Sequence, residues 1–325
     1  MDPTKIEALE QTIRNDCGNI TGIVVRKNGE VRYERYFNGC TADSPTHVFS
    51  VTKSVLSLLI GIAIDEGTIE GVEQKVLDFF PEYTPEPGQE TARGVTLRDL
   101  LTMTAPFQYE EEPYEAYFSS GDWVRSALSL LGGTQHPGVF RYRPLVGPDI
   151  LSGILTRATG RSVLDFARER LFSPLGISVA DSLTFRDQAE QMAFYQSTGV
   201  SCWVADPKGV NTAGWGLTLT AGDMAKIGQL CLDGGRWNGT QLVSARWIRE
   251  STREQVRWAE QNLPYGYLWW VMEHGFAAMG DGGNVIYADR EKGLAVAITS
   301  LMAPEAGDRI GLIQTHIEPL FSDEA

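Results

Sequence analysis

The sequence predicts an α+β fold in which the two ends of the chain form one sheet and the middle supplies a helical insert. Segments rich in β-branched and aromatic residues occur near both ends, at 20–37 and 265–300. Between them, apolar residues recur at helical spacing and are separated by turns rich in Pro and Gly. We therefore expect a discontinuous α/β domain at about 1–65 and 260–325, with a mostly helical domain at about 66–259.

The amino-terminal end is expected to begin with a short helix and to continue as a β-hairpin. Apolar side chains at helical spacing mark one face of Met1–Asp16. Ile20–Arg26 and Val31–Phe37 are rich in β-branched and aromatic residues, and Asn28-Gly29 between them is typical of two-residue hairpin turns. We expect two neighbouring antiparallel strands here, entered from an amphipathic helix.

A helix that is apolar on almost every side is expected to follow Ser50. Residues 51–64 leave almost no polar face, which is typical of a helix buried in a protein core. This stretch is the longest apolar run of the chain, but it is too short and too interrupted to span a bilayer. We therefore expect it to cross the interior of the protein.

Helical patterns dominate the middle of the chain, and strand patterns return near its end. Thr96 begins a Thr-Leu-Arg-Asp pattern that is typical of a helix cap. The expected helices are Leu97–Met103, Asp122–Leu131, Asp149–Thr159, Val163–Leu171, Ala221–Leu232 and Ala245–Arg253. The expected strands are Tyr265–Met272, Val285–Ala288 and Leu294–Ser300, with a final helix at about Ala306–Phe321.

The composition is that of an ordinary globular protein and narrows the choice of partners. Of the 325 residues, 42% are hydrophobic and 22% are charged. The formal net charge of −14 disfavours DNA, RNA and anionic membranes as partners. No secretory signal is visible, and the four cysteines form no C-x-x-C pair. We expect a cytoplasmic protein with reduced thiols, whose oligomeric state the sequence does not indicate.

Several common catalytic systems have no counterpart in the sequence. There is no G-x-S-x-G nucleophile elbow and neither of the usual glycine-rich nucleotide-binding patterns. The four histidines form no H-x-x-x-H pair and no ligand spacing with cysteines, so we expect no metal and no other cofactor. Serine chemistry without a histidine base remains open.

Ser50 and Lys53 form a Ser-x-x-Lys pattern at the start of the apolar helix. Their side chains, at i and i+3, fall one turn apart on the same helical face. A serine in this position can attack a substrate if the lysine takes its proton. Burial favours the neutral, basic form of a lysine, because a charge is costly away from water. A chance match of the pattern is the alternative, so other residues must decide.

Tyr142, within Pro137–Arg143, is a second candidate base. A phenol can move a proton between nucleophile and leaving group if a nearby cation lowers its pKa, and Lys53 would be such a cation. The alternative is a tyrosine that packs at the foot of the helix Asp149–Thr159. Without other evidence, the packing role is the better explanation of Tyr142.

The glycine-rich segment Ala278–Asn284 is the third element of a candidate site. Its glycines would let a strand edge approach a substrate closely and direct a backbone N–H at a developing oxyanion. A tight turn between two strands explains the same glycines equally well.

Together, these three elements resemble the serine β-lactamase and penicillin-binding-protein superfamily. The similarity covers nearly the whole chain. It is greatest to the class C β-lactamase-related branch, which includes family VIII esterases, D-amino-acid peptidases and nylon-oligomer hydrolases. The matching segments include His47–Ser54, Leu100–Ala105, Pro137–Tyr142, Thr218–Leu230 and Gly280–Asn284.

The resemblance implies a fold and a set of roles. The fold is a five-stranded antiparallel sheet flanked by helices, plus an all-helical domain, with the cleft between them. By position, Ser50 would be the nucleophile, Lys53 its base and Tyr142 the second acid/base. The N–H groups of Ser50 and Asp281 would form the oxyanion hole, with Asp281 held in the segment Gly280–Gly282.

Two departures from the family's pattern bear on the substrate. Two residues after the tyrosine, where the family offers Asn or Ser, this chain has Pro144, which has no side-chain hydrogen bond to give. Ala278 stands where β-lactamases present the lysine of Lys-Thr-Gly to a carboxylate. The resemblance therefore implies a serine hydrolase that acts through an acyl-enzyme on a small ester or amide, with weak or no β-lactamase activity.

Two other functions stay open at this point. One is a β-lactamase or D-peptidase, and the other is a non-catalytic, ligand-binding relic of the fold. Retention of Ser50, Lys53 and Tyr142 together argues against the relic. Side chains that could line the cleft and contact a substrate are Tyr109, Tyr114, Trp215, Trp269 and Asn284.

Overall fold

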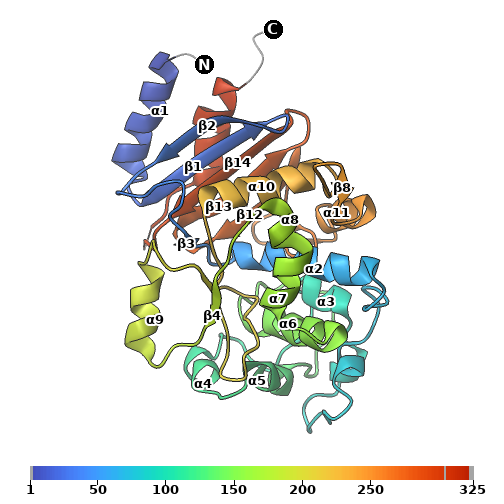
Figure 1. Ribbon diagram of the computed structural model, residues 1–325. Coiled ribbons are helices and arrows are strands. Elements are labelled where there is room, and N and C mark those ends of the chain that lie inside the picture. Colours follow the sequence, from blue (N-terminus) through green and yellow to red (C-terminus); the bar gives the residue numbers. More distant parts are fainter. Residues whose placement is uncertain (1–2, 304, 322–325) are drawn as a thin grey trace.

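The computed structural model describes residues 3–303 and 305–321, and within them an antiparallel sheet of eight strands forms the upper layer in Figure 1. The strand order is β2-β1-β14-β13-β12-β11-β10-β9. The five long strands are β2 (Glu30–Tyr36), β1 (Ile20–Lys27), β14 (Leu294–Ser300), β13 (Asn284–Asp289) and β12 (Gly275–Gly280). The three short strands are β11 (Trp270–Met272), β10 (Leu263–Tyr265) and β9 (Val256–Trp258). The α+β class is confirmed, and three short strands extend the five-stranded sheet at one edge.

Strands from the two ends of the chain pair with each other in this sheet, as the sequence predicts. β1 pairs with the late strand β14, with Ile23 opposite Ile298, and with β2 on its other side. Asn28 (φ 51°) and Gly29 (φ 85°) both adopt the left-handed conformation that a two-residue hairpin turn requires. The predicted hairpin is therefore confirmed, and α1 (Pro3–Asp16) precedes it.

Helices cover both faces of the sheet. On one face lies α10 (Ala221–Leu232), where a Cβ added to Gly228 would be 3.0 Å from Ile286 and 3.3 Å from Ala295. The next residue along β13, Tyr287, points to the other face and interacts with Glu318 near the carboxy-terminal end. That end forms α12 (Arg309–Leu312), η5 (Ile313–Ile317) and η6 (Glu318–Leu320). Burial on both faces explains why β13 and β14 read as nearly continuous apolar runs.

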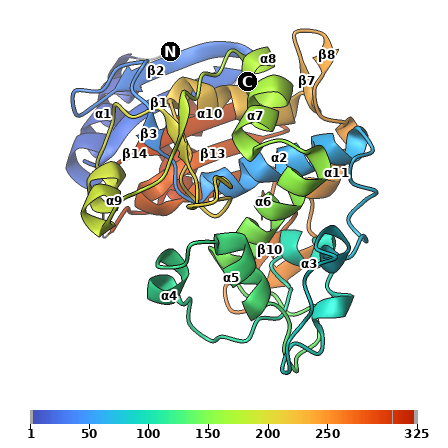
Figure 2. The same ribbon diagram turned by 60° about the horizontal axis from the view of Figure 1, so that its bottom comes forward.

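The apolar helix after Ser50 is α2 (Val51–Asp65), and it lies between the sheet and the helices of the other layer (Figure 2). All its residues from Val51 to Ala63 are buried, which confirms the predicted core helix. Gly61 allows close packing, because an added Cβ would lie 2.2 Å from the indole of Trp247. The same indole donates a hydrogen bond to the backbone oxygen of Ser57 at 2.9 Å.

The predicted helices of the middle are all present, although some are shorter than expected. Thr96 and Asp99 form the predicted capping box of α3. Three helices were not predicted, α4 (Tyr114–Phe118), α8 (Ser173–Leu175) and α9 (Gln188–Tyr195), because each buries a single side chain and shows no apolar periodicity. The predicted helices are α3 (Leu97–Leu101), α5 (Trp123–Leu130), α6 (Val146–Thr159), α7 (Val163–Ala167), α10 and α11 (Ala245–Ser251).

The division into a sheet domain and a helical domain stays a prediction. α10 lies within the range 66–259 that was predicted as mostly helical, but it packs against β14, β13 and β1. The sheet layer therefore includes at least one helix from the middle of the chain. α5 and α6, in contrast, pack against each other in the lower layer of Figure 1.

Two elements near the carboxy-terminal end differ from the prediction. The expected strand Tyr265–Met272 is two short strands, because Leu268 adopts φ 62° and reverses the chain between β10 and β11. Gly266 is required in this reversal, since an added Cβ would lie 2.1 Å from the backbone oxygen of Ser251. The expected helix from about Ala306 begins only at Arg309, after the side chain of Asp308 caps it.

Within the described ranges, no helix is long and apolar enough to cross a membrane. Cys17, Cys202 and Cys231 are buried free thiols, and Cys40 is a half-buried one. A cytoplasmic location stays a prediction.

Candidate active site

The start of α2 places Ser50 and Lys53 side by side. Phe49, just before Ser50, adopts φ 48°, a strained conformation for a residue with a side chain, and this turns the chain sharply into the helix. Lys53 Nζ lies 2.7 Å from Ser50 Oγ and donates a second hydrogen bond to the backbone oxygen of Gly214 at 2.5 Å. The spacing predicted from the Ser-x-x-Lys pattern is thus present in three dimensions.

The Lys53 amine is buried in a way that makes it a base near neutral pH. The side chain is 2% exposed, and this burial lowers its pKa from 10.5 to about 7. The negative charges of Asp281, Asp149 and Glu112 oppose the effect of burial by favouring the ammonium form. At pH 7 a large fraction of the amine is neutral and can accept a proton from Ser50.

Tyr142 lies on the other side of Ser50. Its hydroxyl hydrogen-bonds to the Ser50 side chain, and its ring centroid is 5.5 Å from Lys53 Nζ. The ring is held by Trp270 of β11, with centroids 5.7 Å apart. The condition set out from the sequence, a pKa lowered by a nearby cation, is not met in this structure. Burial dominates and raises the pKa of Tyr142 to about 12, so its hydroxyl keeps its proton at neutral pH.

The glycine-rich third segment is both a strand end and a turn. β12 ends at Gly280, and Asp281–Gly283 turns the chain into β13, with Gly282 at φ 75°. A Cβ added to Gly280 would lie 2.2 Å from the backbone oxygen of Val48 and 3.1 Å from the backbone nitrogen of Ser50. Glycine at this position therefore lets the edge of the sheet reach the start of α2.

Asn284 was predicted as a substrate contact, and this prediction was wrong. Its side-chain nitrogen donates to the backbone oxygens of Asp281 at 2.8 Å and Ser300 at 3.1 Å, while its side-chain oxygen accepts from the Ser300 N–H at 2.9 Å. The side chain is fully buried. It joins the third segment to β14 and leaves no group free for a ligand.

The predicted aromatic residues occupy different positions. Tyr109 donates a hydrogen bond to Glu112 at 3.2 Å and lies under the Arg143 guanidinium, 4.5 Å from its ring centroid. Tyr114 is more than half exposed, whereas Trp269 is fully buried in the core. The side chain of Trp215 is buried. In the sequence this residue follows Gly214, whose backbone oxygen binds Lys53. A substrate contact for Tyr109 or Trp215 stays a prediction.

The backbone oxygen that binds Lys53 belongs to Gly214 and is positioned through Asp149, and neither residue was predicted as part of the site. The buried carboxylate of Asp149 accepts hydrogen bonds from Tyr117, from Thr212 and from the backbone N–H of Ala213, at 2.5, 2.8 and 2.7 Å. It thereby fixes residues 212–214. Gly214 must be glycine, because an added Cβ would lie 2.3 Å from the backbone oxygen of Pro144. Neither contact has a sequence signal, since Asp149 reads as an ordinary residue of a first helical turn.

Glu112 was also missed, and its charge acts on Lys53. Its carboxylate is half-buried, and its Oε2 atom has no hydrogen-bond partner within the described residues. Burial raises its pKa, while the nearby charges of Arg143 and Lys53 act in the opposite direction. Arg143 itself donates hydrogen bonds to the backbone oxygens of Tyr109 and Glu110, so its guanidinium is held against this loop.

His47, two residues before the strained Phe49, does not act as a base. It is fully buried, and burial lowers its pKa to about 3. Its Nε2 atom accepts a hydrogen bond from the Gly216 N–H at 2.9 Å, which ties the start of α2 to the segment after Gly214. The histidine is therefore a neutral structural group.

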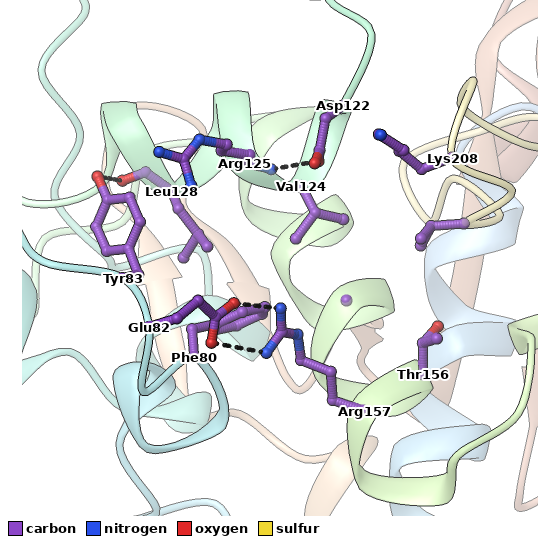
Figure 3. A pocket seen from close by; sticks show the side chains of 12 residues that line it. Phe80, Glu82, Tyr83, Asp122, Val124, Arg125, Leu128, Thr156, Arg157 and Lys208 are labelled. Carbon is purple, nitrogen blue, oxygen red and sulfur yellow. Dashed lines mark hydrogen bonds and ion pairs between the residues drawn. The ribbon is translucent and has the colours of Figure 1, made fainter.

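A separate cavity lies between α5, α6 and the segment before Tyr83, and it contains none of the predicted site residues (Figure 3). Its volume is about 160 Å³. An ion pair between Arg157 and Glu82 lines one wall, and Tyr83 donates a hydrogen bond to the Leu128 backbone at 3.0 Å. In the part of the chain that the structure describes, no three His, Cys, Asp or Glu side chains are grouped to hold a metal ion.

Comparisons with known proteins match almost the whole chain. The profile of the family described as Beta-lactamase matches residues 9–315. A 6-aminohexanoate-dimer hydrolase from Paenarthrobacter ureafaciens is 25% identical over 338 aligned positions, which cover 95% of this chain and 79% of that protein.

Solved structures have the same fold at lower sequence identity. A family VIII carboxylesterase superposes with a TM-score of 0.73 at 19% identity, and the match covers 98% of each chain. A penicillin-binding protein homologue from Caulobacter crescentus superposes with a TM-score of 0.71 at 21% identity, covering 92% of this chain and 91% of that one. The fold expected from the resemblance is confirmed.

Proposed function

This chain belongs to the beta-lactamase family of serine hydrolases, and we propose that it cleaves a small neutral ester, or a small amide, through an acyl-enzyme on Ser50. One observation supports the proposal most strongly. Lys53 Nζ, with a pKa lowered to about 7, lies 2.7 Å from Ser50 Oγ. A neutral amine at this distance is a general base for a serine nucleophile.

In the proposed acylation step, Ser50 Oγ attacks the substrate carbonyl carbon while its proton passes to Lys53. The N–H groups of Ser50 and Asp281 stabilise the negative charge on the carbonyl oxygen. When the carbon–oxygen bond of the ester breaks, the leaving oxygen takes a proton from the Tyr142 hydroxyl. The Lys53 ammonium returns a proton to Tyr142, so the alcohol leaves and the amine is neutral again.

Deacylation reverses the roles with water in place of the alcohol. A water molecule gives a proton to Lys53 as its oxygen attacks the acyl carbon. The bond to Ser50 Oγ then breaks, and the Lys53 ammonium gives its proton to Ser50 Oγ. The product is a carboxylic acid, and all three side chains return to their starting forms.

The charges around the cleft support a neutral substrate. Ala278 offers no cation, and Arg143 is held against the loop backbone. Glu112 and Asp281 both lie close enough to favour the positive form of Lys53. A carboxylate on a β-lactam or a peptide would enter this region without a partner, which is unfavourable.

Pro144 supports an ester over an amide. It has no side-chain group to orient a substrate N–H, and an ester lacks that N–H. A small amide is the second candidate, and the relative named for hydrolysing the 6-aminohexanoate dimer supports it.

The test is a comparison of kcat/KM for p-nitrophenyl butyrate, a D-alanyl dipeptide and a chromogenic cephalosporin. A class C β-lactamase serves as the reference, because the nitrophenyl ester has the better leaving group. We expect this protein's ester-to-cephalosporin ratio to exceed the reference ratio by at least roughly tenfold, the scale of one lost charge contact. A ratio no higher than the reference would favour the β-lactamase function. Failure to cleave any of the three, with Ser50 unmodified, would favour the non-catalytic relic.

A further inference from the structure

The turn Asp281–Gly283, which follows β12, is held by side chains that bind its backbone oxygens. Asn284 and Ser300 donate hydrogen bonds to the first and the third of these oxygens, at 2.8 and 3.4 Å. The middle oxygen accepts a hydrogen bond from the side-chain nitrogen of Asn19 at 2.7 Å. Each backbone oxygen of the turn therefore has its own side-chain donor.

Asn19 lies far from this turn in the sequence, in the loop between α1 and β1. Its half-buried side chain donates a second hydrogen bond, to the backbone oxygen of Leu301 at 2.8 Å. The backbone N–H of Leu301 in turn donates to the backbone oxygen of Asn19 at 2.9 Å. These contacts arise because β1 and β14 are neighbours, with Ile20 opposite Ser300. Asn19 thus joins the turn to the end of β14.

The guanidinium of Arg309 orients the side chain of Asn19. Arg309 is 3% exposed, and its Nη2 atom donates a hydrogen bond to Asn19 Oδ1 at 2.5 Å. Because the side-chain oxygen of Asn19 is used by Arg309, its side-chain nitrogen faces the two backbone oxygens. An amide turned over would place its oxygen against those oxygens and its nitrogen against the guanidinium. Arg309 therefore decides which way round the Asn19 amide lies.

Arg309 is a buried cation whose cost to stability calls for an explanation. Its Nε and Nη1 atoms are buried and have no hydrogen-bond partner among the described residues. Burial lowers the pKa of its guanidinium, and the thiol of Cys17 acts in the opposite direction. The turn lies directly against this group, since a Cβ added to Gly283 would be 2.6 Å from Arg309 Nε. A cation buried with so few partners is unfavourable for folding, which favours a role in the neighbouring site.

We propose that Asn19 and Arg309 are positioning residues for the oxyanion hole. Asn19 holds the Gly282 backbone oxygen and Arg309 orients Asn19, so that the turn keeps the Asp281 N–H directed at the substrate oxygen. In this role neither side chain contacts the substrate. The inference rests on the proposed function, in which the Asp281 N–H is one of two oxyanion donors. It adds two residues that lie near the ends of the chain, outside the three motifs of the site.

The effect on catalysis follows from the precision that an oxyanion donor needs. Such a donor stabilises the transition state only if it lies at hydrogen-bond distance from the oxygen as its charge develops. Groups of this kind must be held within about 0.5 Å of their working positions. Loss of one anchor of the turn is therefore expected to reduce kcat more than substrate binding.

Asn19→Asp is the most specific test, because it keeps the size of the side chain and the acceptor for Arg309. It removes both N–H donors to the backbone. For p-nitrophenyl butyrate we expect kcat to fall roughly tenfold or more, and KM to change less than about threefold. An unchanged kcat in the folded variant, or a rise confined to KM, would overturn the proposal.

Asn262→Asp is the matched control. The side-chain oxygen of Asn262 also accepts a hydrogen bond from an arginine, Arg257, at 3.0 Å, but it does so in the turn between β9 and β10. We expect this substitution to leave kcat and KM unchanged. An equal loss of kcat in Asn19→Asp and in the control would count against a specific role for Asn19.

Arg309→Met tests whether the arginine acts through Asn19. Since an unpaired buried charge is unfavourable, we expect the melting temperature to stay the same or to rise while kcat falls at least about threefold. In an Asn19→Ala background, which lacks the acceptor, the same substitution should cause little further loss. A lower melting temperature with unchanged kcat would show a purely structural role. Independent, multiplying losses would overturn the action of Arg309 through Asn19.

Failure of the proposed function would be recognised separately. If the wild-type protein cleaves no ester and a fluorophosphonate leaves Ser50 unmodified, the hydrolase proposal fails, and crystal structures decide the positioning role. In Asn19→Asp we expect the Gly282 backbone oxygen to move by more than about 0.5 Å from its wild-type position, and in Asn262→Asp we expect it to stay. Arg309→Met gives the same readout if Asn19→Asp does not fold. An unmoved oxygen would overturn the proposal in an active or an inactive protein.

Discussion

The two sides of the cleft differ in how completely their polar groups are partnered. On the side of α2, Lys53 binds both Ser50 Oγ and the Gly214 oxygen, and Asp149 fixes the segment that carries Gly214. Tyr142 completes this side with a hydrogen bond to Ser50. The arrangement is buried and each group is held by hydrogen bonds, which favours proton transfer between positioned groups.

The substrate side lacks such order. Pro144 and Ala278 replace the groups that would bind an amide and a carboxylate, and Glu112 has an unpartnered carboxylate oxygen. The difference supports the proposal that the chain keeps the chemistry of the family but binds anionic substrates weakly. We therefore expect the shape of the site and contacts with neutral groups to decide which substrate is bound.

Removal of the proton-transfer groups is expected to have the largest effect. Lys53→Ala and Tyr142→Phe should each lower kcat for a p-nitrophenyl ester by roughly 10²-fold or more. The double variant should be little worse than the poorer single variant, because the two groups act as one unit with Ser50. Lys75→Ala, which changes an exposed lysine outside the cleft, is the control and should leave kcat unchanged. Independent, multiplying losses would show that Tyr142 only packs against its neighbours.

A side chain placed at the close contact between β12 and the start of α2 is expected to have an intermediate effect on kcat. An alanine side chain at position 280 would meet the Val48 backbone at 2.2 Å, so Gly280→Ala must push β12 away from Ser50. We expect a loss of roughly tenfold or more in kcat, as for one displaced oxyanion donor. Gly121→Ala is the matched control, because nothing lies within 4 Å of the added Cβ. Equal kcat values for the two variants would show that the position of β12 does not affect the reaction.

The smallest expected effect is a shift in the pH dependence of kcat/KM, and this shift reports specifically on Lys53. Only the neutral amine of Lys53 accepts a proton, so kcat/KM should rise with pH through about 7 and then level off. The Asp281 charge favours the ammonium form and raises this pKa, so Asp281→Asn should move the midpoint of the rise to lower pH. Asp43→Asn, on a surface loop, should not move it. A midpoint that shifts upward would contradict the electrostatic argument.

Much of the fold and the nucleophile could be predicted because their signals are local. Ser50 and Lys53 lie one helical turn apart in any α-helix, and the apolar residues after them require burial. The hairpin at Asn28-Gly29 likewise follows from two adjacent residues. These features depend on the chain over a few residues and need no knowledge of distant contacts.

The remaining features depend on contacts between distant segments. Asn284 reads as a polar residue beside a glycine-rich motif, but pairing of β13 with β14 brings it to the Ser300 backbone and uses all its donors and acceptors. Gly214 appears as one glycine among many until Pro144 is packed against it. The pKa of Tyr142 rises because burial outweighs the charge of Lys53, and the depth of burial is a property of the whole fold.

The central claim is that Ser50 is the group that becomes acylated, and its most direct test is covalent labelling. The protein is treated with a fluorophosphonate, its intact mass is measured, and the modified peptide is mapped. We predict a single adduct on Ser50, formed at least roughly 10²-fold more slowly in Lys53→Ala. An adduct on another residue, or no adduct while circular dichroism shows a folded protein, would contradict the account.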